Sequence, residues 1–157
     1  MAYIDVITLS DAKNYLRIDD TLTTDDAQIT RIINASLSFV EQWTNIYVYA
    51  RSKTYLMVDG CKRVYDYPIN SITSPTEADM VNEEKTLYKN FSYGVDTSDL
   101  VLNIGHLLPA SVDVEIIEVA YELIDIMYYG SKSNGTLTEQ LSALSIEVLN
   151  KHRRFIL

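Results

Sequence analysis

The hydrophobic pattern of the chain changes period twice along the sequence, and this change constrains the fold more than any other feature. Apolar residues recur at helical spacing over residues 9–43 and again over residues 116–149. Residues 53–104 are instead rich in β-branched and aromatic residues and contain turn signals. The pattern predicts an α+β fold that is mostly α, with two N-terminal helices, a small antiparallel β-rich middle and two C-terminal helices. Because 157 residues fit one compact domain, we expect residues 1–157 to form a single domain.

Repeated capping signals mark where the helices begin. Thr-Leu-Ser-Asp at residues 8–11 is a capping box, in which the hydroxyl and the carboxylate satisfy amides of the first turn. The same signature recurs at residues 23–26 and at residues 136–139. Pro109 is expected near the start of the third helix. The first three helices are expected to end near these residues: Arg17, Asn45 and Gly130.

The middle of the chain contains one clear hairpin signal. Residues 53–58 and 62–67 are rich in strand formers, and Asp59-Gly60 between them is a turn sequence. Pro68 should end the second strand or confine it to a sheet edge. Further segments are assigned as strands at 70–73, 86–95 and 100–104, a polar loop at 74–84 and a turn at 96–99.

The charge balance excludes several classes of protein. A net charge of −9 argues against a protein that grips phosphates, although double-stranded DNA could pass such a surface without specific binding. The apolar segment 114–129 is short and holds four acidic residues, so no membrane association is expected. The first eleven residues carry two acids and no basic residue, which is unlike a signal peptide. Cys61 is the only cysteine, so the chain has no internal disulfide and is compatible with the cytosol.

No combination of residues indicates an enzyme, a metal site or a cofactor site. Only two histidines occur, His106 and His152, and no nucleophile-elbow or phosphate-loop motif is present. Cys61 beside a turn is best interpreted as a passive small residue. The acidic pairs at residues 19–20 and 25–26 lack the alternation and the glycine of a calcium loop, so we interpret them as helix-capping groups. We therefore predict no catalytic residues, no metal and no cofactor.

The end of the sequence combines a basic cluster with an apolar tail. Two interpretations of the cations stay open: they bind DNA or an acidic partner, or they stabilise the C-terminus of the last helix. The apolar residues that follow favour an interaction, because exposed hydrophobic ends lower solubility unless they are docked. The segment comprises Lys151, His152, Arg153, Arg154, Phe155, Ile156 and Leu157.

Taken in order, several of these motifs resemble one known family. The segment Leu-Ser-Asp-Ala-Lys-Asn-Tyr-Leu-Arg-Ile-Asp at residues 9–19 resembles the opening of the phage head–tail connector family. The acidic pair at 25–26, the Glu-Gln-Trp-Thr at 41–44, the Tyr-Pro-Ile-Asn-Ser-Ile at 67–72, the Tyr-Gly-Val-Asp at 93–96 and the ending at 148–154 are similar to the family's pattern. The chain departs from that pattern at Tyr128-Tyr129-Gly130-Ser131 and has no matching feature in residues 74–85.

The resemblance implies a structural virion protein with no enzymatic activity. Such subunits form a homo-oligomeric ring, commonly a dodecamer, between the portal protein and a downstream tail or stopper protein. The ring extends the DNA channel for genome retention and ejection. By position, residues 147–157 would engage the portal. The protein would be located in the virion at the head–tail interface, and in the host cytoplasm during assembly.

A ring built head to tail needs two different contact faces on each subunit. The Asp59-Gly60 hairpin could supply one face by edge pairing, with tyrosines as contact residues. Each tyrosine could equally serve core or cross-strand packing. The candidates are Tyr47, Tyr49, Tyr55, Tyr65 and Tyr67.

Two other functions stay open from the residues alone. One is a monomeric adaptor or binding module of a phage or bacterium that uses its helical face. The other is a small enzyme with a site around His106 and the neighbouring acids.

Overall fold

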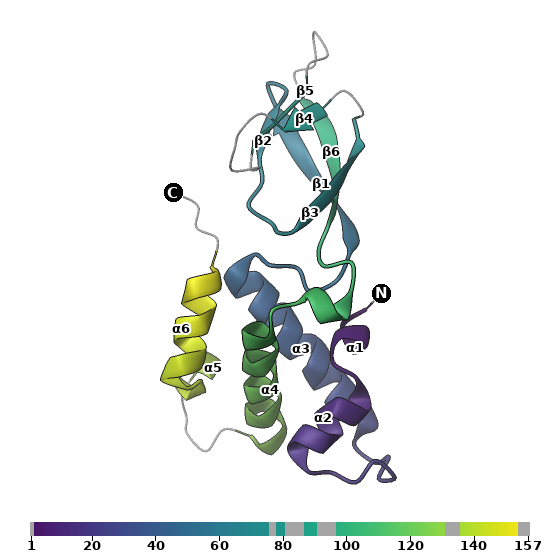
Figure 1. Cartoon of the computed structure of the whole chain (residues 1–157), viewed down its shortest axis with the longest axis vertical. Helices are drawn as coiled ribbons and strands as arrows, with labels where there is room; N and C mark the ends of the chain where they lie inside the picture. The colour runs from purple at the N-terminus through teal and green to yellow at the C-terminus, as the bar shows by residue number, and fades with distance from the viewer. Residues whose placement is uncertain (1, 76–77, 81–86, 91–96, 131–135, 154–157) are drawn as a thin grey trace.

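The computed structural model describes residues 2–75, 78–80, 87–90, 97–130 and 136–153. Helices form one half of the molecule and a curled antiparallel sheet forms the other half (Figure 1). The sheet comes from the middle of the chain, and the helices come from the segments before and after it. The predicted α+β class with helices on both sides of a β-rich middle is therefore confirmed.

The helices largely follow the capping signals. The two expected N-terminal helices are present, with Thr8 capping the first, and a one-turn helix precedes them. The expected last helix is two helices, because Ser142 starts a new one by accepting a hydrogen bond from the amide of Ser145 at 3.2 Å. This restart shifts the helical phase, so Leu144, predicted to face the core, is 70% exposed. The elements are α1 (Tyr3–Val6), α2 (Leu9–Leu16), α3 (Asp26–Thr44), the 3₁₀ helix η1 (Pro109–Ser111), α4 (Val114–Tyr129), α5 (Leu137–Gln140) and α6 (Ala143–His152).

Six strands form one sheet in the order β3-β6-β1-β2-β5-β4. Strands β1 and β6 pair along their whole length, from Arg51 opposite Ile104 to Val58 opposite Thr97. Asp59 and Gly60 have φ values of 51° and 67°, as the tight turn of a hairpin requires. The strands are β1 (Arg51–Val58), β2 (Cys61–Arg63), β3 (Ile69–Ser74), β4 (Ala78–Met80), β5 (Leu87–Asn90) and β6 (Thr97–Ile104).

Three sequence-based strand assignments were wrong in part. The return strand expected at 62–67 stops at Arg63, because the chain leaves the sheet and Tyr67 forms a bridge with Ile46. Residues 97–99, expected in a turn, belong to β6 and pair with β1. Residues 78–80, expected in a loop, form β4. Residues 97–99 and 78–80 form strands because β1 and β5 supply backbone partners for them, which outweighs their local composition.

The expected edge at the Asp59-Gly60 hairpin is also wrong. Strand β1 pairs with both β6 and β2, and β2 pairs with both β1 and β5. Both hairpin strands therefore have a neighbouring strand on each side, and β1 meets β2 at Val58 opposite Cys61. The edges of the sheet are β3 and β4.

The apolar residues form two clusters, one in each half of the molecule. The helical cluster packs the stripe of α3, which includes Ile33, Leu37 and Val40, against buried residues of α4 such as Ile116 and Leu123. The sheet has its own smaller cluster around Met57, Tyr88, Leu100 and Leu102. Across the described ranges, every helix is too short or too polar to cross a membrane.

A buried lysine fixes the loop between α2 and α3. Lys13 is 2% exposed, and its Nζ lies 2.5 Å from Oδ1 of Asp26 at the start of α3. The same ammonium donates hydrogen bonds to the carbonyl oxygens of Leu22 at 2.8 Å and of Asp20 at 3.2 Å. Two carbonyl oxygens thus accept hydrogen bonds from the ammonium, and Asp26 supplies the counter-charge that a buried cation requires.

This arrangement corrects the interpretation of the acids at residues 25–26 as capping groups. Asp25 occupies the N-cap position of α3 but makes no side-chain capping bond, and its carboxylate accepts from the hydroxyl of Tyr128 at 2.7 Å. Asp26 is the partner of Lys13. Both acids therefore connect α3 to other helices.

Replacing Lys13 with methionine should lower the free energy of unfolding by about 2–3 kcal/mol, because Asp26 and two carbonyl groups lose their common partner. Urea denaturation measures the change. The matched control is Arg31→Met, which alters an exposed cation of α3 and should stay within about 0.5 kcal/mol of the parent protein. Equal effects of the two substitutions would contradict the anchoring role of Lys13.

Candidate interaction surfaces

A buried carboxylate connects the helices to the sheet. Glu41, in the last turn of α3, accepts hydrogen bonds at Oε2 from the Tyr3 hydroxyl and from the Arg51 guanidinium, each at 2.5 Å. Its other oxygen, Oε1, accepts the backbone N–H of Val48 at 2.9 Å. One side chain thus joins α1, α3 and the start of β1.

Aromatic rings enclose the arginine of this junction. The Arg51 guanidinium carbon lies 4.3 Å from the ring centre of Tyr47 and 4.7 Å from that of Tyr49. Burial alone would lower the pKa of Arg51, but the hydrogen bonds to Tyr3 and Glu41 outweigh it and raise the pKa above its ordinary value. Glu41 and Arg51 are therefore held as an ion pair, and two aromatic rings lie close enough to the guanidinium for cation–π interaction.

A second polar group continues from the junction onto the sheet. Asp66 accepts from Lys53 Nζ at 2.6 Å and from the Tyr55 hydroxyl, and Lys53 also donates to the Tyr47 hydroxyl at 2.5 Å. Burial, followed by the bond to Asp66, raises the pKa of Tyr55, so this hydroxyl stays protonated as a donor. These contacts tie β1 to the segment that leaves β2.

The five tyrosines proposed as contact residues therefore divide into two groups. Tyr47, Tyr49 and Tyr55 take part in the polar networks of their own chain, and Tyr49 also packs edge-on against Tyr3. Tyr65 is half-buried and Tyr67 is 45% exposed. Contact of any of the five with a neighbouring subunit stays a prediction.

The basic residues at the end of α6 contact the start of α4. Lys151 Nζ lies 2.7 Å from Oε2 of Glu115, and Nε2 of His152 lies 3.1 Å from the same oxygen. The hydrogen bonds from Lys151 and His152 hold the pKa of Glu115 below its ordinary value. Lys151 and His152 are thus near the C-terminus of their own helix and also paired with an acid of another helix. Arg154, Phe155, Ile156 and Leu157 lie outside the described residues.

The same end of α4 carries the one group within the described ranges that resembles a metal-binding set. One ligand atom from each of Asp113, Glu115 and His152 lies within 4.8 Å of the others. Glu115 is already neutralised by Lys151, and both acids are exposed. The set is therefore better explained as an ion-paired contact between α4 and α6.

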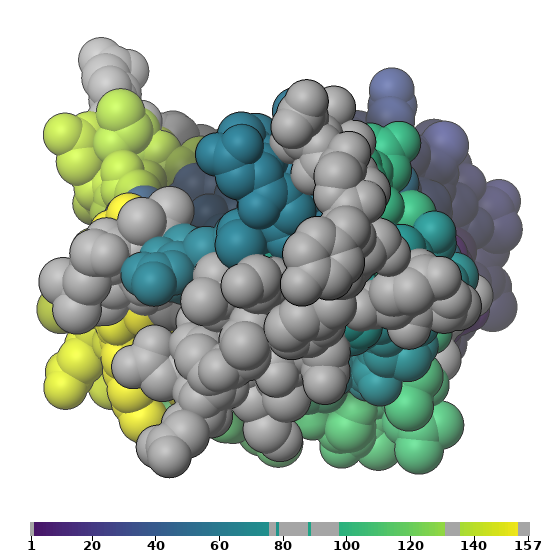
Figure 2. All heavy atoms as spheres, turned by 90° about the horizontal axis from the view of Figure 1, so that it is seen from above, coloured from purple at the N-terminus to yellow at the C-terminus, as the bar shows by residue number. Residues whose placement is uncertain are grey.

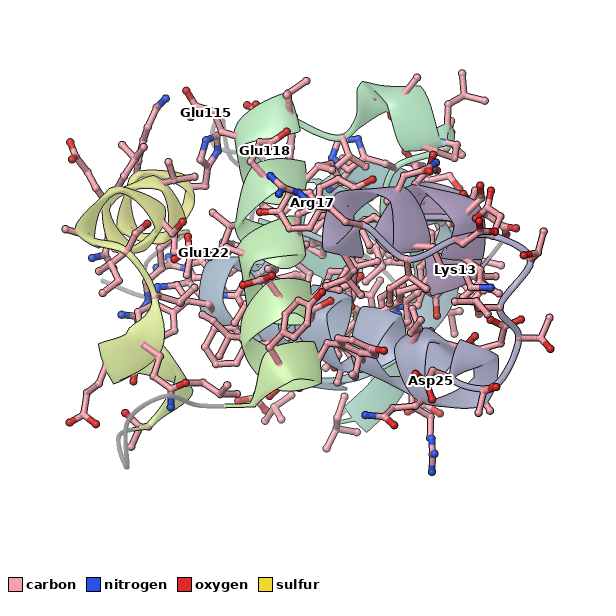
Figure 3. The ribbon with its side chains drawn as sticks, turned by 90° about the horizontal axis from the view of Figure 1, so that it is seen from below. Lys13, Arg17, Asp25, Glu115, Glu118 and Glu122 are labelled. Carbon is pink, nitrogen blue, oxygen red and sulfur yellow. The ribbon has the colours of Figure 1, made fainter. Side chains whose placement is uncertain are left out.

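Another acid of α4 caps α6. Glu122 accepts from the backbone N–H of Ser142 at 2.6 Å and from its hydroxyl at 2.9 Å, and it also accepts from the Ser145 hydroxyl. Figure 3 shows Glu115 and Glu122 on the side of α4 that faces α6. This contact could not be predicted from the sequence, because a serine at a helix start gives no indication of which distant acid it will meet.

Arg153 lies beside an aromatic pocket. Its guanidinium carbon is 5.9 Å from the ring centre of Trp43, whose Nε1 donates to Oδ1 of Asn150 at 3.3 Å. Phe39, Gln42, Trp43 and Arg153 line a pocket of about 270 Å³ on the surface between α3 and α6. The pocket lies where the predicted C-terminal interaction segment begins.

His106 has a structural partner. Its Nδ1 lies 3.0 Å from the hydroxyl of Ser111, which donates to the carbonyl oxygen of Leu108 at 2.6 Å. Burial lowers the pKa of His106, and the charge of Asp113 opposes this only in part, so the ring is neutral at pH 7. The histidine thus stabilises the turn around η1.

A protein-family model described as phage gp6-like head–tail connector protein matches residues 6–93 of this chain. The chain belongs to this family. The match spans α2, α3 and most of the sheet, which includes the junction of Glu41 with Arg51. The family is one of structural connector proteins, so the prediction of a non-enzymatic head–tail connector is confirmed, and the small-enzyme alternative around His106 is excluded.

Solved structures with the same fold come from gene transfer agent (GTA) particles. A chain of the virion of a native GTA particle has a TM-score of 0.74 and 10% sequence identity, with 100% of this chain and 94% of that chain covered. A chain from the neck of an empty GTA particle, computed with C6 symmetry, has the same score and identity, with 97% of this chain and 91% of that chain covered. At such low identity the likeness establishes the fold alone. No curated protein sequence matches this chain.

Removing the charge of Glu41 should weaken the junction between the helical half and the sheet. Glu41→Gln leaves the partly buried Arg51 without a counter-ion, so the free energy of unfolding should fall by about 2–3 kcal/mol. The amide of Val48, bonded to Glu41, should exchange with solvent faster. Urea denaturation and hydrogen exchange measure the two effects, with the exposed Glu147→Gln as the matched control. An unchanged Val48 exchange rate would refute the role of this junction.

The contact between α4 and α6 should depend on pH in the acidic range. Because the folded pKa of Glu115 is lowered from 4.5, its pairing is fully present above pH 4.5 and is lost as the pH falls through the lowered value. NMR titration of the Glu115 carboxyl carbon should give a midpoint below 4.5, and Lys151→Met should raise it. The exposed Glu118 serves as the internal reference. A Glu115 midpoint that is insensitive to Lys151→Met would contradict this pairing.

Proposed function

We propose that this chain forms a ring, with twelve copies as the expected number, between the portal and the tail of a phage particle. The match to the head–tail connector family over more than half of the chain is the observation that carries the proposal. The neck of a GTA particle, computed with C6 symmetry, contains a chain of the same fold. Sixfold symmetry is compatible with six or twelve subunits, so it agrees with the expected number.

The ring would extend the DNA channel without gripping the duplex. The net charge of −9 repels phosphates. Four of the described cations are also held by carboxylates of the same chain, in the pairs Lys13–Asp26, Arg51–Glu41, Lys53–Asp66 and Lys151–Glu115. Such a surface suits genome retention and ejection, because both require double-stranded DNA to slide past without specific binding.

The portal would be bound by residues 147–157, with the tail or stopper protein on the opposite face of the ring. Lys151 supports this assignment, since it stays largely exposed although it is paired with Glu115. Arg153 presents its guanidinium beside Trp43 on the same surface. In this proposal the connector assembles in the host cytoplasm and remains in the virion at the head–tail interface.

Ring formation is tested by mass photometry and negative-stain microscopy of the protein, alone and mixed with the portal protein of the same phage. The expected result is a closed ring with a central channel, bound coaxially to the portal. A protein that stays monomeric at micromolar concentration and does not bind the portal would support the alternative of a monomeric adaptor module.

The portal-binding segment is tested by replacing Phe155, Ile156 and Leu157 together with serine. Loss of the apolar side chains should weaken portal binding at least about tenfold, since buried apolar contacts dominate binding energy. The circular dichroism spectrum and the thermal midpoint should not change. Lys62→Ser on β2 is the control substitution and should leave binding intact. If the triple variant binds the portal with unchanged affinity, residues 155–157 are not part of the portal interface.

A further inference from the structure

Two leucines project from the turn that follows the sheet. Leu107 and Leu108 are 58% and 65% exposed, although large aliphatic side chains are rarely left so exposed next to each other. They precede Pro109, the first residue of η1. We call this pair the leucine knob.

The backbone holds the leucine knob rigidly. Gly105 donates its N–H to Pro68 at 2.7 Å, and His106 donates its N–H to Tyr47 at 3.0 Å. Gly105 has a φ of 98°, and a Cβ there would lie 2.0 Å from the carbonyl oxygen of Tyr49, so only glycine fits. On the other side, the Ser111 amide and hydroxyl both donate to the Leu108 carbonyl oxygen, at 3.0 and 2.6 Å. A preorganised knob loses little conformational entropy when it binds.

The pocket of Phe39, Gln42, Trp43 and Arg153 is the concave counterpart. The rings of Phe39 and Trp43 lie 5.8 Å apart and form an apolar wall. A cavity of about 150 Å³ is enough to hold benzene, so a pocket of about 270 Å³ has room for a leucine side chain. Trp and Arg are also the residues most enriched among those that dominate binding energy at protein interfaces.

The leucine knob and the pocket lie on opposite sides of the molecule, at a similar position along its long axis. In Figure 1 the turn with η1 lies to the right, beside α1, and the adjoining ends of α3 and α6 lie to the left. In Figure 2, viewed along the long axis, the yellow of α6 is again on the left, and the green of residues around 105–110 is at the lower right. A convex feature on one side and a concave one on the other allow copies to bind head to tail.

The charges on the two sides are complementary. Neither residues 2–12 nor residues 105–115 contain a lysine or an arginine, and the exposed Asp5 lies on α1, which packs against η1. The pocket side carries Arg153. Such opposite charges steer unlike faces together and disfavour contact between two identical faces.

We propose that the leucine knob of one copy inserts into the Phe39–Trp43 pocket of the next copy, and that this contact closes the ring. The inference rests on the proposed ring and names the residues that build it. Each copy gives its knob to one neighbour and its pocket to the other. This arrangement gives each subunit the two different contact faces that a head-to-tail ring needs. It does not require edge pairing by the Asp59-Gly60 hairpin, which lies inside the sheet.

Disulfide trapping tests the contact directly. In a Cys61→Ser background, Gln42→Cys and Leu108→Cys are combined in one chain and the protein is oxidised at a concentration that gives rings. Head-to-tail contact predicts a ladder of trimers and larger species under denaturing conditions. Either cysteine alone should give no ladder. In the matched control, Leu144→Cys replaces Leu108→Cys, because Leu144 is equally exposed but lies near the start of α6.

The intrinsic fluorescence of the protein provides a second readout, since Trp43 is its only tryptophan. Assembly should shift the emission of Trp43 to shorter wavelength and reduce its quenching by acrylamide. Leu108→Asp should raise the dissociation constant for assembly at least about tenfold, whereas Leu144→Asp should leave it unchanged.

The outcomes separate this inference from the proposed function. If rings form but the ladder is absent and Leu108→Asp assembles like the parent protein, the proposed knob-and-pocket contact is wrong. The proposal that the chain forms a ring is then still supported. If the parent protein forms no ring alone or on the portal, the proposed function fails and the contact fails with it. A ladder from the Gln42–Leu108 pair, with none from the Gln42–Leu144 pair, establishes the contact.

Discussion

The ion pair of Glu41 with Arg51 is the interaction on which the relation between the two halves depends. Each half has its own hydrophobic cluster, so apolar packing alone does not determine how the sheet sits on the helices. The Glu41 carboxylate of α3 accepts one hydrogen bond from Arg51, the first residue of β1, one from the Val48 amide and one from the Tyr3 hydroxyl of α1. A buried charge requires such complete pairing, and the resulting geometry is correspondingly specific. The rings of Tyr47 and Tyr49 lie beside the guanidinium of this pair.

Sequence reasoning predicted the features that depend on local periodicity and capping. The helical spacing of apolar residues predicted over residues 9–43 is confirmed in α3, where Ile29, Ile33 and Val40 are buried. The capping boxes at residues 8–11 and 136–139 start helices. The Asp59-Gly60 turn forms because its two residues tolerate positive φ values. These features are determined within a few residues of the chain, so the sequence is sufficient to predict them.

The errors concern pairing between distant segments. Residues 97–99 are polar, yet they form a strand because β1 supplies a complete set of partners. The hairpin at residues 59–60 was expected at an edge, but β5 and β6 cover both of its sides. The surroundings of the candidate contact residues also depend on segments that are distant in sequence. Contact of Tyr47 with a neighbouring subunit stays a prediction, and its place beside Arg51 depends on a glutamate of another element that no local pattern identifies.

In the proposed ring, the internal pairing of Arg51, Lys53 and Lys151 has a consequence for DNA that passes through the channel. Proteins that grip DNA displace the condensed counterions of the phosphates, and the release of these ions drives binding. A wall whose cations are already neutralised by its own carboxylates displaces few of them. The duplex would then keep its ionic atmosphere as it moves, and its friction against the wall would change little with salt concentration.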